Sequence, residues 1–276
     1  QSSLSRRRDV RRIQDLLRRQ ASAAHAAVLA RFFKTGPGEY GQGDRFLGLR
    51  VPQVRAVVKE LGPAATPADA RELLRSPWHE ERLCALLLWV HQFREGDQRT
   101  RREIYTAYLA STDRINNWDL VDLSAEHVVG GWLHARSRRP LYRLARSRCL
   151  WERRIAILAT FHFVRRGEFD DTLALAELLR NDEHDLMHKA VGWLLRGGQT
   201  RPGRGRDLPP PLLPPTPPHH APLRHRTLPR AAAPALPGRE GHLGKGASMP
   251  NQFAPATFRT TDALGEGTGG YAVHGA

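Results

Sequence analysis

The chain has 276 residues, and its 43 lysine and arginine residues against 28 acidic ones give a formal net charge of +15. This excess favours a polyanionic partner, but charge alone does not choose between DNA, RNA and an acidic membrane. The two cysteines, Cys84 and Cys149, exclude a disulfide framework, and we expect a reducing, cytoplasmic setting. No apolar run approaches the ~18 residues of a membrane span, and no signal peptide opens the sequence.

Apolar residues recur at helical spacing through the first two thirds of the chain, interrupted by a glycine-rich loop at 36–43. No convincing run shows the two-residue alternation of a strand. We therefore predict that residues 1–196 form an all-α domain. Several expected helices begin at proline or aspartate. Their predicted ranges are 9–33, 52–60, 67–75, 78–94, 98–110, 117–134, 138–147, 151–165, 170–180 and 184–196.

Basic residues that directly precede apolar helical runs recur at nearly regular intervals. Arg82 and Arg154 are 72 residues apart, and Lys189 follows 35 residues later. A step of 36 from Arg82 reaches Trp118. A period in the mid-thirties with two helices per unit is typical of a solenoid, in which every second helix lines one concave face. The alternative is an irregular helical bundle.

The stretch Asp113–Leu123 places an indole near a carboxylate. Trp118 lies four residues before Asp122, so both side chains share one face of a helix, with Asp119 on the flank. Such a pair is useful if it faces a groove. The alternative is an ordinary helix start, with Asn116 or Asn117 as the N-cap and Trp118 as packing.

The last part of the chain differs in composition. Fourteen of the 20 prolines lie beyond residue 200, so we predict that residues 197–276 are a disordered tail. The predicted helix at 184–196 stops in the middle of its pattern, which suggests that the tail is the product of a shifted reading frame. Gln1 in place of methionine predicts that the chain starts inside a longer frame. Residues 1–200 carry 34 basic and 24 acidic side chains, so the helical part is itself basic.

Five strings stand out along the helical part: RFLGLRVPQVR, SPWHEERLCALLLW, TDRINNWDLVD, LWERRIAILATF and HKAVGWLLR. In this order and at these separations they resemble the DNA alkylation repair family of AlkD-type glycosylases. The resemblance implies a right-handed superhelical solenoid of HEAT-like repeats that holds duplex DNA. It also implies excision of positively charged N3- and N7-alkylpurines without a cofactor or metal. The family continues with further helices beyond the last string, and this sequence does not.

Matched position by position, the resemblance implies that Asp122 is the catalytic carboxylate, Trp118 and Trp193 are the groove tryptophans, and Arg154 is the groove arginine. These positions agree with those that the repeat spacing places on one face. An N-alkylpurine is already cationic and leaves without acid catalysis, so one carboxylate is chemically sufficient. We expect a monomer associated with the nucleoid through DNA, and no membrane association.

The basic side chains expected to contact DNA are Arg154, Lys189, Arg82 and Arg50. For Arg154 the alternative is an ion pair with Glu152, Asp122 or Asp119, and for Trp193 it is interior packing. The histidines form no triad or metal-ligand arrangement, so they are interpreted as core or surface residues (His79, His127, His162, His184 and His188). At the level of function, the alternatives are a helical-repeat module that binds nucleic acid or protein without catalysis, and a truncated product without function.

Overall fold

The structure, a computed structural model, describes the backbone of residues 3–199 and the side chains of residues 9–196. Within this range the chain forms helices and a single isolated β-bridge, but no strand, which confirms the all-α prediction. No described helix has both the length and the apolar character needed to span a membrane. The predicted tail began at residue 197, but the last helix continues through residue 199. The rest of the tail, and with it the proposed shifted frame, lies outside the described residues.

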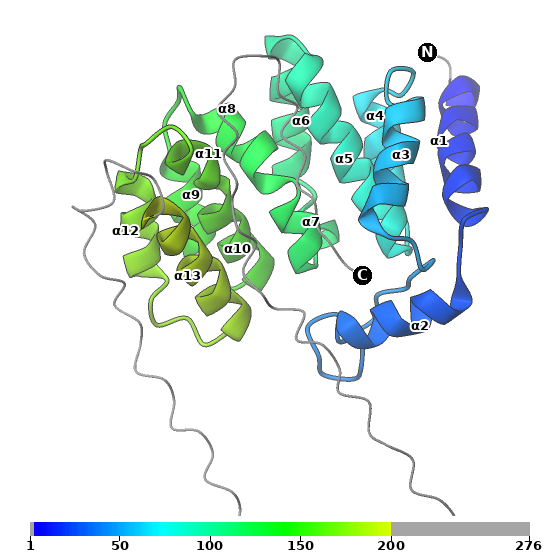
Figure 1. The fold of residues 1–276 in the computed structure, drawn as a ribbon. Helices are drawn as coiled ribbons and strands as arrows, with labels where there is room; N and C mark the ends of the chain where they lie inside the picture. Colours follow the sequence, from blue (N-terminus) through cyan, green and yellow to red (C-terminus); the bar gives the residue numbers. More distant parts are fainter. Residues whose placement is uncertain (1–2, 200–276) are drawn as a thin grey trace, which may run out of the picture. The chain divides into compact units, whose positions relative to one another are not determined.

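The first part of the fold contains α1 (Ser3–Arg18), α2 (Ala23–Phe32), α3 (Val51–Leu61), α4 (Pro67–Leu73), α5 (His79–Glu95) and α6 (Gln98–Leu109). The prediction of one helix over 9–33 is wrong, because the chain breaks between α1 and α2. Ser22 causes this break: its side chain accepts the His25 N–H at 3.3 Å, and its own N–H donates to the Leu47 carbonyl at 2.9 Å. α2 therefore lies across the ends of other helices instead of continuing α1 (Figure 1).

The second part contains η1 (Thr112–Arg114), α7 (Trp118–Asp122), the π-helical turn η2 (Glu126–Gly130), α8 (Gly131–Leu133), α9 (Arg139–Ala145), α10 (Leu150–Ala159), α11 (Phe161–Val164), α12 (Asp170–Leu178) and α13 (Asp185–Gln199). The helices predicted at 117–134 and 151–165 are each divided. A hydroxyl bonds a carbonyl of the same helix near each division: Ser124 donates to Leu120 at 2.5 Å, and Thr160 to Ile157 at 2.7 Å. Such local bonds compete with the regular helical ladder.

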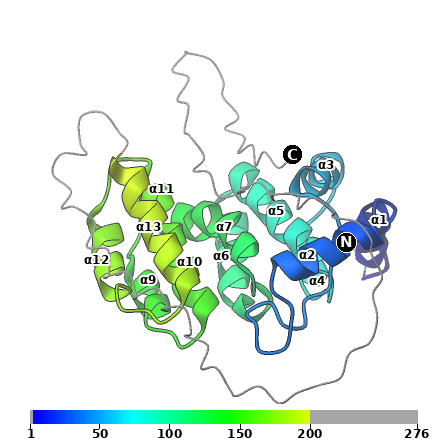
Figure 2. The ribbon, with the colours of Figure 1, turned by 60° about the horizontal axis from the view of Figure 1, so that its bottom comes forward.

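Two largely buried helices, α5 and α10, contact most of the other helices. α5 packs against α3, α4, α6 and η2, and α10 packs against α7, α9, α12, α13 and η2. Their apolar residues belong to one continuous core with the described part of α1. Figures 1 and 2 show the helices following one another in chain order from the blue end to the yellow end. The right-handed HEAT-like superhelix stays a prediction.

The first turn of α5 is polar and buried, which the amphipathic pattern did not predict. Four consecutive residues, His79, Glu80, Glu81 and Arg82, are each at most 4% exposed; we call them the polar quartet. Glu80 accepts the backbone N–H groups of Leu47, Gly48 and Leu49 at 2.8, 2.8 and 3.1 Å. Glu81 accepts from Gln14 and Arg18 of α1 at 2.8 and 2.9 Å. The quartet thus holds α1 and the chain before α3 in place, because buried carboxylates need such partners.

Candidate active site

Asp122 of α7 and Arg154 of α10 form a bidentate ion pair. Arg154 donates from Nε to Oδ1 and from Nη2 to Oδ2, each at 2.8 Å. Its remaining Nη1 donates to the carbonyl of Leu186 in α13 at 2.5 Å. The carboxylate side chain is 15% exposed and the guanidinium 6%. Burial raises the pKa of Asp122, and the Arg154 charge opposes that rise without cancelling it.

Trp118 begins α7, where the Asn117 side chain accepts its backbone N–H at 2.9 Å. This identifies Asn117 as the N-cap, one of the two residues expected there. The indole is half-buried under the end of α2. It stacks on Phe33 with ring centroids 5.1 Å apart and meets the edge of Phe32 at 5.8 Å. Phe32 remains 46% exposed, so this aromatic cluster reaches the surface beside α7.

Tyr40 comes from the glycine-rich loop and reaches both helices of the ion pair, α7 and α10. Its hydroxyl lies near the Trp118 side chain. Its ring meets Trp151 of α10 at 6.1 Å and His184 at 6.3 Å, edge to face. Burial raises the pKa of Tyr40, which excludes a tyrosinate near neutral pH. The sequence reasoning missed this residue, although a lone aromatic side chain in a glycine-rich loop is a signal for it.

The other two predicted residues on α13 have partners of their own. Trp193 is half-buried and meets Phe161 of α11 edge to face at 4.6 Å, about two helical turns along α13 from Leu186. Lys189 is exposed and pairs with Asp185 at 2.7 Å. The structure therefore joins Asp122 directly to Arg154 and places Trp118 about one helical turn before Asp122 in α7. It places Trp193 on the helix whose first turn contacts Arg154.

The prediction that Arg82 contacts DNA is wrong. The residue is 4% exposed, and its guanidinium is bound to Asp44 and to the Ser76 carbonyl. It serves the polar quartet instead, because a buried guanidinium needs fixed acceptors. Arg154 is also buried and follows the expected alternative, an ion pair with Asp122. Arg50 is exposed just before α3 and remains accessible to a phosphate.

A second group of basic side chains lies at the opposite end of α5 from the quartet. Arg94 approaches the His127 ring of η2 with its Nη2 at 3.3 Å from Nε2. Burial, and then the charges of Arg94 and Arg165, lowers the pKa of His127 to about 3. Burial, and then the charge of Arg94, lowers the pKa of Arg55 in α3. Glu126 of η2 pairs with Arg165 at 2.6 Å, so the group keeps an excess of positive charge, which is the electrostatic pattern expected of an anion-binding surface.

A family model described as DNA alkylation repair enzyme matches residues 13–201. The chain belongs to the DNA alkylation repair enzyme family. This confirms the resemblance and indicates that the protein has a role in DNA alkylation repair. The chain is similar to the solved structure of a predicted DNA alkylation repair enzyme from Enterococcus faecalis. The structural match includes 65% of the present chain and 84% of the Enterococcus chain, with a TM-score of 0.50 and 17% sequence identity. That likeness shows a shared fold. None of the curated proteins compared with the chain matches it.

Within this repair-family chain, the described part holds no group of histidine, cysteine, aspartate or glutamate residues suited to a metal ion. Its candidate site instead contains one ion-paired carboxylate, aromatic faces and a phenol. A carboxylate has about four acceptor positions, and Arg154 occupies two of them. The rest can accept hydrogen bonds from a water molecule, while the carboxylate keeps its negative charge. This arrangement suits stabilisation of a cation and orientation of water.

Proposed function

We propose that this protein is a DNA glycosylase that hydrolyses the N-glycosidic bond of N3- and N7-alkylated purines in duplex DNA. It needs no cofactor, acts as a monomer in the cytoplasm, and starts base-excision repair. The family's role in DNA alkylation repair supports this function. The observation that carries it is the Asp122–Arg154 pair, because the pair holds a carboxylate in a fixed orientation beside an indole.

The reaction follows from the charge of the substrate. The alkylated purine carries a positive charge, so the bond from C1′ to the base nitrogen breaks with its electron pair moving to the base. The sugar is left with oxocarbenium character, as in glycoside hydrolysis. Asp122 stabilises that cation and accepts a hydrogen bond from the water that attacks C1′, whose released proton passes to solvent. Electrostatic stabilisation of this kind is worth ~3 kcal/mol or more.

The remaining side chains bind and orient. The Trp118 face attracts the cationic sugar by about 0.5–2 kcal/mol, and Trp193 supplies a second indole from α13. Arg154 positions Asp122 by its two parallel bonds. Arg50 and Lys189 are the exposed basic residues of the predicted set, and they are assigned to the DNA phosphates.

The test is release of N7-methylguanine from methylated duplex DNA by the full chain. Asp122→Asn keeps the shape of the side chain and removes its charge, so we expect a loss of at least ~100-fold in kcat. Asp113→Asn is the matched control, because Asp113 lies just before α7 with its side chain 73% exposed. An inactive wild-type protein, or an Asp122→Asn variant as fast as wild type, refutes the proposal. DNA binding without release by wild type favours the non-catalytic module instead.

A further inference from the structure

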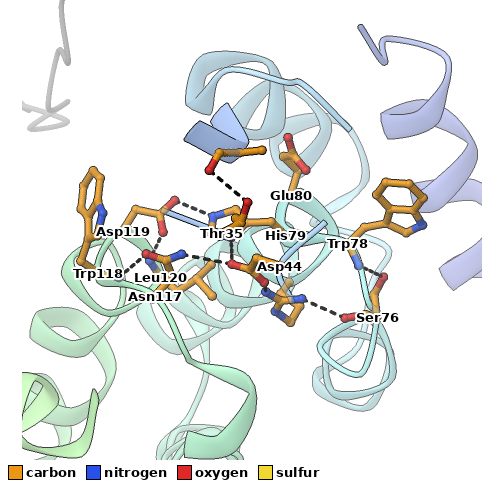
Figure 3. Close-up of polar contacts among 12 residues, drawn as sticks. Thr35, Asp44, Ser76, Trp78, His79, Glu80, Asn117, Trp118, Asp119 and Leu120 are labelled. Carbon is orange, nitrogen blue, oxygen red and sulfur yellow. Dashed lines mark hydrogen bonds and ion pairs between the residues drawn. The ribbon is translucent and has the colours of Figure 1, made fainter. Parts of the chain in front are cut away.

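His79 lies between two carboxylates that belong to different parts of the fold. Its Nδ1 is 2.9 Å from Oδ2 of Asp44, and its Nε2 is 2.8 Å from Oδ2 of Asp119. The imidazole side chain is 2% exposed. Figure 3 shows the ring between these two groups, with Asn117 beside them. Phe33 and Phe46 pack on the same ring, with centroids 5.0 and 4.6 Å away.

The two contacts determine the protonation state of His79. A neutral imidazole has one N–H donor, and an ionised carboxylate only accepts. Both bonds are therefore satisfied only by the imidazolium, with a proton on each nitrogen. The surrounding charges agree with this state. Arg82, on the same helix, binds the other oxygen of Asp44, so two carboxylates face two cations, and Asn117 donates to Asp44 at 3.1 Å.

Each carboxylate belongs to a segment that forms one side of the candidate site. Asp44 follows Tyr40 by four residues and comes directly after the glycine-rich loop. Asp119 follows Trp118 in α7, and its Oδ1 accepts the Leu120 N–H at 2.8 Å. The bridge through His79 thus connects the loop that carries the phenol to the helix that carries the indole and Asp122. Tyr40 and Trp118, which lie near each other, belong to the same two segments.

We propose that His79 is a positioning residue whose imidazolium, by bridging Asp44 and Asp119, holds the Tyr40 loop against α7 in the geometry needed for base excision. The activity part of this proposal rests on the proposed function. The structural part, a charged bridge that fixes the loop, does not. Neutralising His79 removes one donor and breaks one of the two bonds, so the loop is held against α7 less firmly, with the Asn117–Asp44 hydrogen bond remaining.

The direction of the pH dependence follows. Burial favours neutral His79, but the charges and hydrogen bonds of Asp119 and Asp44 outweigh it and raise the pKa of His79 to about 9. The bridge is therefore complete near neutral pH and is lost as the pH rises through about 9. Asp122 determines the acidic limb of the pH–activity profile, because activity falls when that carboxylate becomes protonated at low pH.

A spectroscopic measurement tests the bridge without any assay of activity. In the full-length protein with ¹⁵N-labelled histidine and tryptophan, we expect two N–H resonances from the His79 ring at pH 7. We also expect the Trp118 indole N–H resonance, assigned with Trp118→Phe, to move with a midpoint near pH 9. A single ring N–H at pH 7, or a Trp118 resonance that does not change between pH 7 and 10, overturns the proposal.

A kinetic measurement tests the consequence. In His79→Gln both N–H donors are on one nitrogen, so the amide does not reproduce the bonds that the two ring nitrogens make to separate carboxylates. We expect kcat for N7-methylguanine release to fall by tenfold or more and the loss of rate above pH 9 to disappear. Affinity for DNA should change less than threefold. His91→Gln, on the same helix, is the control and should keep the wild-type profile. An unchanged alkaline limb in His79→Gln refutes the positioning role. If wild type releases no base while the spectra behave as expected, the proposed function fails and the bridge stands.

Discussion

Arg154 donates two parallel hydrogen bonds of 2.8 Å to the two oxygens of Asp122, and its third donor reaches the carbonyl of Leu186. One side chain therefore connects α7, α10 and α13 at the candidate site. The pair is only slightly exposed, so its charges are screened less than those of a surface pair. Removing either partner leaves the other with an uncompensated charge.

Arg154→Gln should move the acidic limb of activity to higher pH. Loss of the guanidinium removes an attraction that now opposes the raised pKa of Asp122, so the carboxylate protonates more readily. We expect a shift of about one pH unit or more in the kcat/KM profile, and a loss of about 3 kcal/mol in stability. Arg153→Gln, which breaks the neighbouring pair with Asp182, is the control. A shift to lower pH would contradict this account.

Trp118→Leu should lower kcat/KM by about tenfold, because the leucine retains an apolar contact with Phe33 but has no π face for a cationic sugar. The comparison is Trp132→Leu. Trp132 is also half-buried, and it stacks on Tyr105 and Arg136 in another part of the fold. Thermal melts of both variants separate packing from function. Equal losses of activity in the two variants would contradict a role for Trp118 in the candidate site.

Gly48→Ala should destabilise the fold much more than Gly38→Ala. Both glycines have positive φ, 90° and 77°, which an alanine adopts with strain of ~1 kcal/mol. A Cβ at Gly48 would also lie 2.2 Å from the Ser22 carbonyl oxygen, whereas a Cβ at Gly38 meets no atom within 4 Å. Because the Ser22 backbone cannot yield easily, we expect Gly48→Ala to lose several °C more in Tm. Similar melting temperatures for the two variants would show that the backbone around Gly48 adjusts freely.

Arg94→Ala should weaken DNA binding and reduce the salt slope of log K against log[salt] by about one. The reason is the crowding of like charge near Arg94, which a phosphate would relieve. Arg102→Ala removes an exposed arginine of α6 and is the control. The measurement is fluorescence anisotropy with duplex DNA between 50 and 300 mM salt. Equal slopes for both variants would exclude the cluster around Arg94 from the interface.

The helical fold was predictable because apolar periodicity reports which face of each helix is buried. Most predicted helices are present within a few residues of their expected ends. The breaks were harder to predict, because Ser22, Ser124 and Thr160 act through hydrogen bonds with particular partners. A hydroxyl in a helical pattern does not reveal whether it bonds its own helix or faces solvent.

The candidate site was only partly predictable. The i, i+4 spacing of Trp118 and Asp122 could be read from the sequence. The burial of Arg82 could not, because its partner Asp44 lies 38 residues away in a loop without periodicity. His79 was interpreted only as a core or surface residue; the structure buries it, and its charge depends on two carboxylates 35 and 40 residues distant. Long-range polar pairing leaves little local signal, so charged residues on a helix were assigned to solvent or DNA by default.

The bridge formed by Asp44, His79 and Asp119 also has an evolutionary consequence. If the imidazolium is replaced in a relative, both carboxylates are left buried with reduced compensation, and selection should replace them as well. The three alignment columns should then be inherited as a block, even between members as divergent as 17% identity. Joint retention of the triplet would distinguish homologues that keep this loop docked from those that share only the scaffold of helices.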